Sequence, residues 1–468
     1  MPQAVVSVAL MVVSSAVQQT MADGFWKTPG FDPVKKAEEA ERRAADPNGF
    51  REVPVRQALA PRRYVYGGCR VGGAVFFEDN ANPYLYVGAA LSDGVIQAVD
   101  AVWFGNQNIA LAAESPSGQA EAATGNKWYS KYKVSYRLGT VSQTADAMLT
   151  TDDISSTLPS DFWQRGVACA VSRLHWGDSS EQHSALWGTS INPTYDIRGV
   201  RVYDPRDGAQ DPDDETTWVY SDNPALCVLH ALTHAWGIAL DIDDIDLPSV
   251  ENAADVCDAT TTYASVSVPY FTLAGVFQSE ADMAGQISRM LDSFGGAITF
   301  SDGKYKMYAD AARSSVWTIT DDDILELGEY VHSAEPENVY NVISASYFDA
   351  ADEGATTVTE VYEDAAAATE GVRETTIRLP FTPAVHSAQI LAYRALARMR
   401  NGRTLTVTVS DAGLWLEAFD VVVISSATYP AFDGTWDVVQ VDMKDVGVEL
   451  TLREYVSAAY TNPTTYLV

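Results

Sequence analysis

Cys227, His230 and His234 are the residues whose types and spacing could bind a metal. At positions i, i+3 and i+7 they share one face of a helix, and a thiolate with two imidazoles is a zinc ligand set. No Glu stands between the histidines as in H-E-x-x-H, and a fourth ligand would have to come from elsewhere. We expect a packed helix face with hydrogen-bonded histidines and no metal; a zinc site is the alternative.

Acidic clusters and a glycine-rich stretch are the other candidates for a binding site. The acidic residues gather at 204–215, 241–246 and 321–323, and none of these clusters has the ligand spacing of a calcium loop. The stretch 67–73 is rich in glycine but lacks the Lys-Ser/Thr pair of a phosphate-binding loop. We interpret the clusters as solvated loops and the glycines as turns or bulges between strands.

Catalytic patterns are missing as well. The sequence contains no G-x-S-x-G, and its six histidines form no recognisable Ser/His/Asp set. Paired carboxylates carry no information in a chain with 63 acidic residues. We therefore expect no catalytic residues, no cofactor and no enzymatic activity.

The elements that would position these residues fall into three regions. Short β-type runs fill residues from about 55 to 220 and alternate with Gly, Asn, Asp and Pro. A small α+β region follows, with a helix over Ala225–Trp236 that begins at Asn223-Pro224 and a second helix from Ser279 to Gly295. The apolar runs on either side of Asp302-Gly303 predict a β-hairpin.

The last region combines seven predicted strands with one helix. The helix runs from about Pro383 to Arg400. Positive charge near the end of a helix interacts favourably with the helix dipole, which accounts for the arginines gathered there; a salt bridge between subunits is the alternative. These arginines are Arg394, Arg398, Arg400 and Arg403. We expect one small barrel or sandwich with the helix on its side. The strands are expected at Val342–Phe348, Thr357–Tyr362, Thr375–Phe381, Leu405–Val409, Val421–Ile424, Trp436–Met443 and Val448–Leu452.

Composition excludes several classes of function. The chain has 468 residues, too many for one core, and a net charge of −32, which argues against a nucleic-acid clamp and against docking on an anionic membrane. Its four cysteines show no C-x-x-C pattern, so reduced, buried thiols and folding in a cytoplasm are expected. The largely apolar stretch 4–17 lacks a charged region before it, and we interpret it as a segment that packs on another subunit; a discarded signal peptide is the alternative.

Two stretches resemble a known family. The first runs from Val55 to Gly67 and continues into Arg70–Gly73. The second runs from Arg201 to Gly208 and is followed by Trp218 and by Asn223–Leu226. Both resemble central tail-tip hub proteins of siphophages and gene transfer agents, a group that includes the tail tip attachment protein of phage lambda and is related to the myophage baseplate hub. The residues that carry this resemblance are Arg56, Pro61, Arg62, Arg63, Tyr66, Gly67, Asp204, Pro205, Asn223 and Pro224.

The resemblance implies a fold and a place in a particle. The implied fold is mainly β with α+β parts, multidomain, with two tail-tube-protein-like β-barrel domains plus a small α+β domain. The implied function is a homotrimeric ring that ends the tail tube, adapts six-fold to three-fold symmetry and forms part of the DNA-ejection channel. The implied partners are the distal tail protein, the tail tube ring, other tail-tip proteins, a separate fibre, and DNA that passes without specific binding.

The expected domains follow from the elements and the resemblance together. They are an N-terminal segment with a short helix (1–54), interleaved β domains with the first tube-like barrel (55–220), a peripheral α+β domain (221–312), a second tube-like barrel (313–456) and a C-terminal tail (457–468). The expected location is the tail tip of a virion assembled in a bacterial cytoplasm. An acidic secreted glycan-binding or glycoside-hydrolase-type β protein is the alternative from another class.

Overall fold

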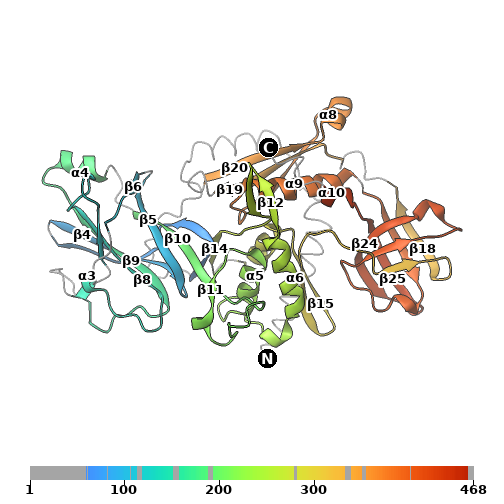
Figure 1. The fold of residues 1–468 in the computed structure, drawn as a ribbon, viewed down its shortest axis with the longest axis horizontal. Helices are drawn as coiled ribbons and strands as arrows, with labels where there is room; N and C mark the ends of the chain where they lie inside the picture. Colours follow the sequence, from blue (N-terminus) through green and yellow to red (C-terminus); the bar gives the residue numbers. More distant parts are fainter. Residues whose placement is uncertain are drawn as a thin grey trace.

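The described part of the chain is elongated, with β sheets at both ends and most helices between them (Figure 1). The computed structural model describes residues 60–461, except 61, 82, 106, 113–118, 151–157, 188–192, 279–281, 333–338, 350–354 and 401. The residues outside this set include the apolar stretch 4–17, the short helix predicted within residues 1–54, Arg56 and Pro61.

Two antiparallel sheets form the N-terminal end of the molecule. The first has the order β3-β4-β9-β8-β7, and the second has the order β11-β10-β5-β6, with β2 also paired to β10. Their strands are β2 (Gly68–Val71), β3 (Ala74–Ala81), β4 (Tyr84–Asp93), β5 (Ile96–Phe104), β6 (Gln107–Ile109), β7 (Gln119–Glu121), β8 (Tyr132–Leu138), β9 (Val167–His175), β10 (Pro193–Val202) and β11 (Val219–Tyr220). Two short helices, α3 (Ala147–Thr150) and α4 (Ser180–Trp187), lie beside them.

The prediction that this region is β-rich is confirmed, and so is the role of its glycines. Gly67 and Gly73 both have positive φ and lie at turns on either side of β2. Sequence reasoning missed β10, although this strand joins β2, β5 and β11. Along most of β10 buried residues alternate with less buried ones, as expected for a strand with one face in the core.

Helices and hairpins make up the middle of the molecule (Figure 1). Asn223 caps α5 by accepting a hydrogen bond from the Ala225 backbone N–H at 3.0 Å, and Pro224 occupies the first turn, as predicted. Asp302 and Gly303 have positive φ and connect the predicted hairpin. The elements are α5 (Pro224–Thr233), α6 (Leu247–Asp258), α7 (Met283–Asp292), β12 (Thr260–Tyr263), β13 (Val266–Pro269), β15 (Ala297–Ser301) and β16 (Lys304–Tyr308).

The seven predicted strands of the last region fall into two sheets with separate cores, and not into the one barrel or sandwich that the sequence predicts. Three of them form a separate sheet of order β20-β19-β21, against which α9 packs. The other four join two strands that were not predicted, in a second sheet of order β17-β23-β24-β25-β22-β18. The first group is β19 (Val342–Asp349), β20 (Ala355–Tyr362), β21 (Glu374–Leu379), α8 (Asp364–Glu370) and α9 (Val385–Arg400).

We call the second group the C-terminal sheet. Its strands are β17 (Trp317–Ile319), β18 (Ile324–Val331), β22 (Thr404–Val409), β23 (Val421–Ile424), β24 (Gly434–Met443) and β25 (Val448–Glu454). It curls around its own core, which is separate from the main core of the molecule. The separate core is the physical reason for the regrouping, because each sheet buries its apolar face against a different set of side chains.

The remaining features concern the chain's arginines and its C-terminal end. Residues 458–461, expected within a C-terminal tail, form a short helix, α10 (Ala458–Thr461), which contacts α9. The four arginines around the end of α9 pair within the chain: Arg394 and Arg398 with Asp310, Arg400 with Glu370, and Arg403 with Glu454. None of the helices in the described part of the chain has the length and apolarity needed to cross a bilayer.

Candidate functional site

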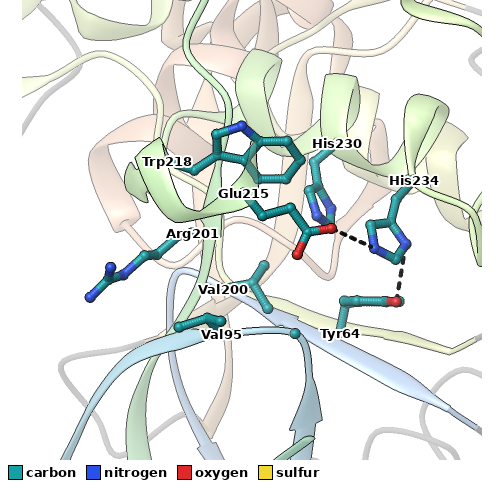
Figure 2. A pocket seen from close by; sticks show the side chains of 9 residues that line it. Tyr64, Val95, Val200, Arg201, Glu215, Trp218, His230 and His234 are labelled. Carbon is teal, nitrogen blue, oxygen red and sulfur yellow. Dashed lines mark hydrogen bonds and ion pairs between the residues drawn. The ribbon is translucent and has the colours of Figure 1, made fainter. Parts of the chain in front are cut away.

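The histidines singled out in the sequence lie where strand β1 (Arg63–Tyr66) meets helix α5. The Tyr66 hydroxyl lies 2.7 Å from Nδ1 of His230, and the Tyr64 hydroxyl lies 3.0 Å from Nδ1 of His234. The two imidazoles stack on each other with ring centroids 4.9 Å apart. Figure 2 shows these rings beside Glu215 and Trp218, which come from the segment before α5. We call this set of two tyrosines and two histidines the Tyr–His joint.

Burial keeps the histidines of the joint neutral at pH 7. It lowers the pKa of His230 to about 3, and the neighbouring His234 acts in the same direction. Burial also lowers the pKa of His234, whereas Glu215, 3.8 Å from its Nε2, acts the opposite way. Burial raises the pKa of Tyr66 well above its ordinary value, so its hydroxyl keeps its proton. In the tautomer of His230 protonated at Nε2, Tyr66 therefore donates to Nδ1.

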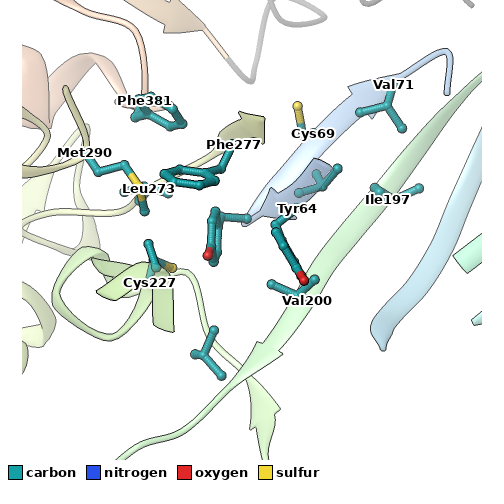
Figure 3. Close-up of a cluster of buried hydrophobic side chains, with 14 of the residues drawn as sticks. Tyr64, Cys69, Val71, Ile197, Val200, Cys227, Leu273, Phe277, Met290 and Phe381 are labelled. Carbon is teal, nitrogen blue, oxygen red and sulfur yellow. The ribbon is translucent and has the colours of Figure 1, made fainter. Parts of the chain in front are cut away.

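Cys227 does not complete a ligand set with the two histidines. Its thiol is fully buried among apolar side chains (Figure 3), and its Sγ lies 3.7 Å from the Ser221 carbonyl oxygen. Burial raises the pKa of this thiol well above its ordinary value, whereas a zinc ligand must be a thiolate. Across the residues that the structure describes, no group of three His, Cys, Asp or Glu side chains could hold a metal ion.

The first sequence motif turns sharply at the end of β1. Gly67 has a φ of +63°, and a Cβ at this position would lie 2.0 Å from the Leu273 carbonyl oxygen. Only glycine fits such a close backbone approach. Before the strand, Arg62 stacks over the Trp236 ring at 3.9 Å from its centroid and lies 3.5 Å from Asp93. Arg63 is buried at the start of the strand. The motif thus fixes the path of β1 on both sides.

The second motif holds two helices together. Asp204 pairs with Arg206 at 2.8 Å, and Arg206 also reaches Asp255 and Asp258 on α6, both at 2.9 Å. These carboxylates raise the pKa of Arg206 above its ordinary value.

Asn223 and Pro224 start α5 and connect it to α6. The Asn223 side chain accepts from the Ala225 N–H and donates from Nδ2 to the Ala254 carbonyl oxygen on α6 at 2.9 Å. Pro205 follows Asp204 in the loop that Arg206 anchors. The structure therefore gathers the described motif residues around β1, α5 and α6, in contacts internal to the chain.

Sequence reasoning missed four side chains of this arrangement. The contacts of these side chains were not predicted, because their partners are distant in sequence or lie on α6, a helix that was not predicted. The four residues are Tyr64, Arg206, Asp255 and Glu215. The cavity beside the Tyr–His joint has a volume of about 10 Å³, which is space for one water molecule. With neutral, hydrogen-bonded rings and so little space, the arrangement suits a rigid connection between β1 and α5.

The chain is similar to a phage tail protein family in one region and to a gene transfer agent virion chain in its fold. Residues 285–441 match the family model described as "Putative phage tail protein". No curated protein sequence matches the chain. Among solved structures, a chain of the virion of a native gene transfer agent (GTA) particle is 15% identical, with 88% of each chain covered and a TM-score of 0.61.

Two bacterial tail proteins align less well. The tail protein from Neisseria meningitidis MC58 is 12% identical, with 77% of this chain and 98% of that chain covered and a TM-score of 0.33. The prophage tail protein gp18 from Listeria monocytogenes EGD-e is 10% identical, with 81% and 86% covered and a TM-score of 0.28. The chain thus contains a region that matches a phage tail protein family, and it shares its fold with a chain of a gene transfer agent virion.

Proposed function

We propose that this protein is a structural component of a phage or gene-transfer-agent tail, and that it forms the central hub of the tail tip. The observation that carries this proposal is the fold shared with a chain of the gene transfer agent virion over 88% of both chains. The match of residues 285–441 to a phage tail protein family supports it independently.

The proposed hub is a homotrimeric ring that ends the tail tube, adapts six-fold to three-fold symmetry and leaves a channel for DNA. Its partners are the distal tail protein, the tube ring, other tail-tip proteins and a separate fibre. The net charge of −32 supports a channel wall along which DNA passes without binding, because like charges repel the phosphate backbone. The tube-like barrels at 55–220 and 313–456 remain predictions, and the second would have to draw on both the β20-β19-β21 sheet and the C-terminal sheet.

The chemistry of the motif residues also supports a structural role. Buried or paired contacts of the motif residues hold one part of the chain against another. The residues that make these contacts are Tyr66, Gly67, Asp204 and Asn223. Such contacts keep a subunit rigid under load. We accordingly propose a non-enzymatic role for this protein.

Light scattering and negative-stain microscopy of the purified full-length chain test the proposal. We expect a mass of three subunits and rings with a central hole, either for the chain alone or after addition of tail tube rings. Antibodies against the chain should then label one end of the tail in purified particles. Labelling along the tube or on the head would contradict the tip location.

The same sample distinguishes the alternative. A monomer that adds to no tail component, binds polysaccharide, or clears peptidoglycan in a zymogram would favour an acidic glycan-binding or glycan-hydrolysing protein. A Glu or Asp substitution that abolished the clearing would then contradict the non-enzymatic role.

A further inference from the structure

A group of four arginines lies where the C-terminal sheet meets the rest of the chain. Arg394 and Arg398 come from α9, Arg313 from the segment before β17, and Arg453 from β25. We call these four residues the junction arginines. Their position is unexpected in a chain with twice as many acidic as basic residues.

Two carboxylates face the junction arginines. Asp310 is buried and pairs with Arg398 and with Arg394, whose Nη1 lies 3.7 Å from Oδ2. Asp437 is buried and lies 2.8 Å from Arg313 and 3.5 Å from Arg453. The Tyr460 hydroxyl adds a neutral contact, donating to Asp310 at 2.8 Å. Within these pairs four guanidinium groups face two carboxylates, an excess of two positive charges before Asp420, which interacts with Arg313, is counted.

The excess charge borders a small cavity. Arg313, Arg398 and Arg453 line it, together with Asp310, Tyr308 and Phe419. Nε of Arg453 is buried there and has no hydrogen-bond partner among the described residues. Burial and the neighbouring Arg398 lower the pKa of Arg453, against the effect of Asp437. The Arg453 side chain as a whole is 20% exposed, but a buried donor atom is costly unless an acceptor reaches it.

Two other charged groups near the cavity, Lys306 and Glu417, are already paired with each other. Lys306 lies 2.6 Å from Glu417, which also accepts from Ser301 and Tyr308. Burial raises the pKa of Asp420, whereas Arg313 and Lys306 act the opposite way. Oδ2 of Asp310 is buried without a hydrogen bond and faces Arg394, so a new anion would be held on the Arg313 and Arg453 side.

The size of the cavity selects among anions. The volume that the centre of a water molecule can occupy in this cavity is about 20 Å³, which corresponds to one or two water positions. The two oxygens of a single carboxylate match that space, and a planar carboxylate matches the fork of a guanidinium. A tetrahedral phosphate needs more room.

We propose that the junction arginines form a carboxylate-binding site, with Arg313 and Arg453 as the principal ligands. The carboxylate is either a free small anion or an Asp or Glu side chain of another copy of this acidic chain. Binding would neutralise the excess charge and fix the C-terminal sheet against α9 and the β15–β16 hairpin. This proposal does not depend on the proposed function.

Acetate is the probe for the test, used with the full-length chain at pH 7 and constant ionic strength. We expect acetate to raise the melting temperature in a saturable way relative to chloride, and ¹³C-acetate signals to broaden on addition of protein. Arg453→Gln should reduce acetate affinity about tenfold or more, the loss expected for one charge-assisted hydrogen bond. Arg313→Gln tests the same site if Arg453→Gln does not fold.

Arg198→Gln is the matched control, because Arg198 is a half-exposed residue paired with Asp100 on the N-terminal sheets. Equal responses to acetate and chloride, or acetate binding unchanged in both junction variants, would overturn the proposal and leave the cavity to water. An equal response to phosphate would overturn the assignment to a carboxylate. Light scattering separates the two sources: a mass unchanged by acetate indicates a free anion, and an assembly that acetate dissociates indicates a side chain from another copy.

Discussion

The Tyr66 hydroxyl and Nδ1 of His230 are 2.7 Å apart, although 164 residues separate them in the chain. Both groups are buried, so neither can turn to water if the other is lost. This pair should therefore hold β1 to α5 more firmly than the pair of Tyr64 and His234, in which Tyr64 is buried but His234 is partly exposed.

Tyr66→Phe should lower the free energy of unfolding by about 1–3 kcal/mol, because it leaves a buried ring nitrogen without its partner. Tyr64→Phe is the matched variant and should cost less, since His234 lies partly in contact with solvent. Urea unfolding followed by tryptophan fluorescence measures both. Equal costs for the two variants would contradict the importance of burial at the joint.

The Tyr–His joint should make the protein sensitive to acid. The pKa of His230 is about 3 in the folded chain and about 6.5 in the unfolded chain, so the unfolded state takes up a proton between these values. Stability is therefore expected to fall as the pH decreases from about 6.5 toward 3.

His230→Asn tests this dependence, because the amide can accept the Tyr66 hydrogen bond but does not titrate. Its free energy of unfolding should fall less between pH 7 and 4 than that of the wild type. His332→Asn, at an exposed position, is the control. A slope unchanged by His230→Asn would show that other groups cause the acid sensitivity.

Asp292→Asn should stabilise the protein above neutral pH. Burial at the end of α7 raises the pKa of this carboxyl to about 7, so the folded state holds its proton more tightly than the unfolded state. Its contribution to stability is fully present below about pH 4 and is lost as the pH rises through 7. We expect a gain of about 1–3 kcal/mol at pH 8 and little change at pH 4, measured by urea unfolding. The exposed Asp322→Asn serves as the control; an equal gain there would indicate a general charge effect.

Gly67→Ala should destabilise the chain by about 3 kcal/mol or more, because the added methyl group meets the Leu273 carbonyl oxygen. Gly105→Ala separates this clash from backbone strain, since Gly105 also has positive φ but has no atom within 4 Å of an added Cβ. It should cost about 1 kcal/mol. Equal melting temperatures for the two variants would contradict the steric argument.

Trp436→Asp should prevent folding of the C-terminal sheet. The indole is fully buried in the core of that sheet and donates to the Phe432 carbonyl oxygen at 2.9 Å. A carboxylate there is costly, because the neighbouring Arg403, 5.3 Å from the ring centroid, is already paired with Glu454. Because the main core is separate, calorimetry should show that the unfolding transition of the C-terminal sheet is lost and that of the main core is retained. Soluble protein with unchanged transitions would refute this, and the exposed Trp415→Asp is the control.

Local signals in the sequence predicted local structure well. Asn223-Pro224 marked the start of α5, and Asp302-Gly303 marked the hairpin, because caps and tight turns depend on a few adjacent residues. The strand predicted at Trp436–Met443 is present, and its first residue, Trp436, is buried. Helix α6 was missed although Asp246 caps it and a proline occupies its first turn, so a closer reading could have found it.

Pairing between distant segments could not be predicted in the same way. Alternation shows which face of a strand is buried, but not which strand lies beside it. The seven strands of the last region were therefore grouped by their order in the chain, whereas the structure divides them between two cores. The Tyr66–His230 contact was missed for the same reason, since neither residue carries a local sign of the other.

The chain passes through the C-terminal sheet twice. It enters at β17 and leaves after β18 for the β20-β19-β21 sheet and α9. It then enters again at β22 and leaves after β25 for α10. Because four separate connections join the sheet to its surroundings, a single proteolytic cut would not release it. A shortened gene ending before residue 404 would remove four of its six strands and leave the other two without the partners they pair with. Exchange of the sheet in evolution or engineering therefore requires one of two changes. Either its surroundings are exchanged with it, or its two chain segments, β17–β18 and β22–β25, are replaced together.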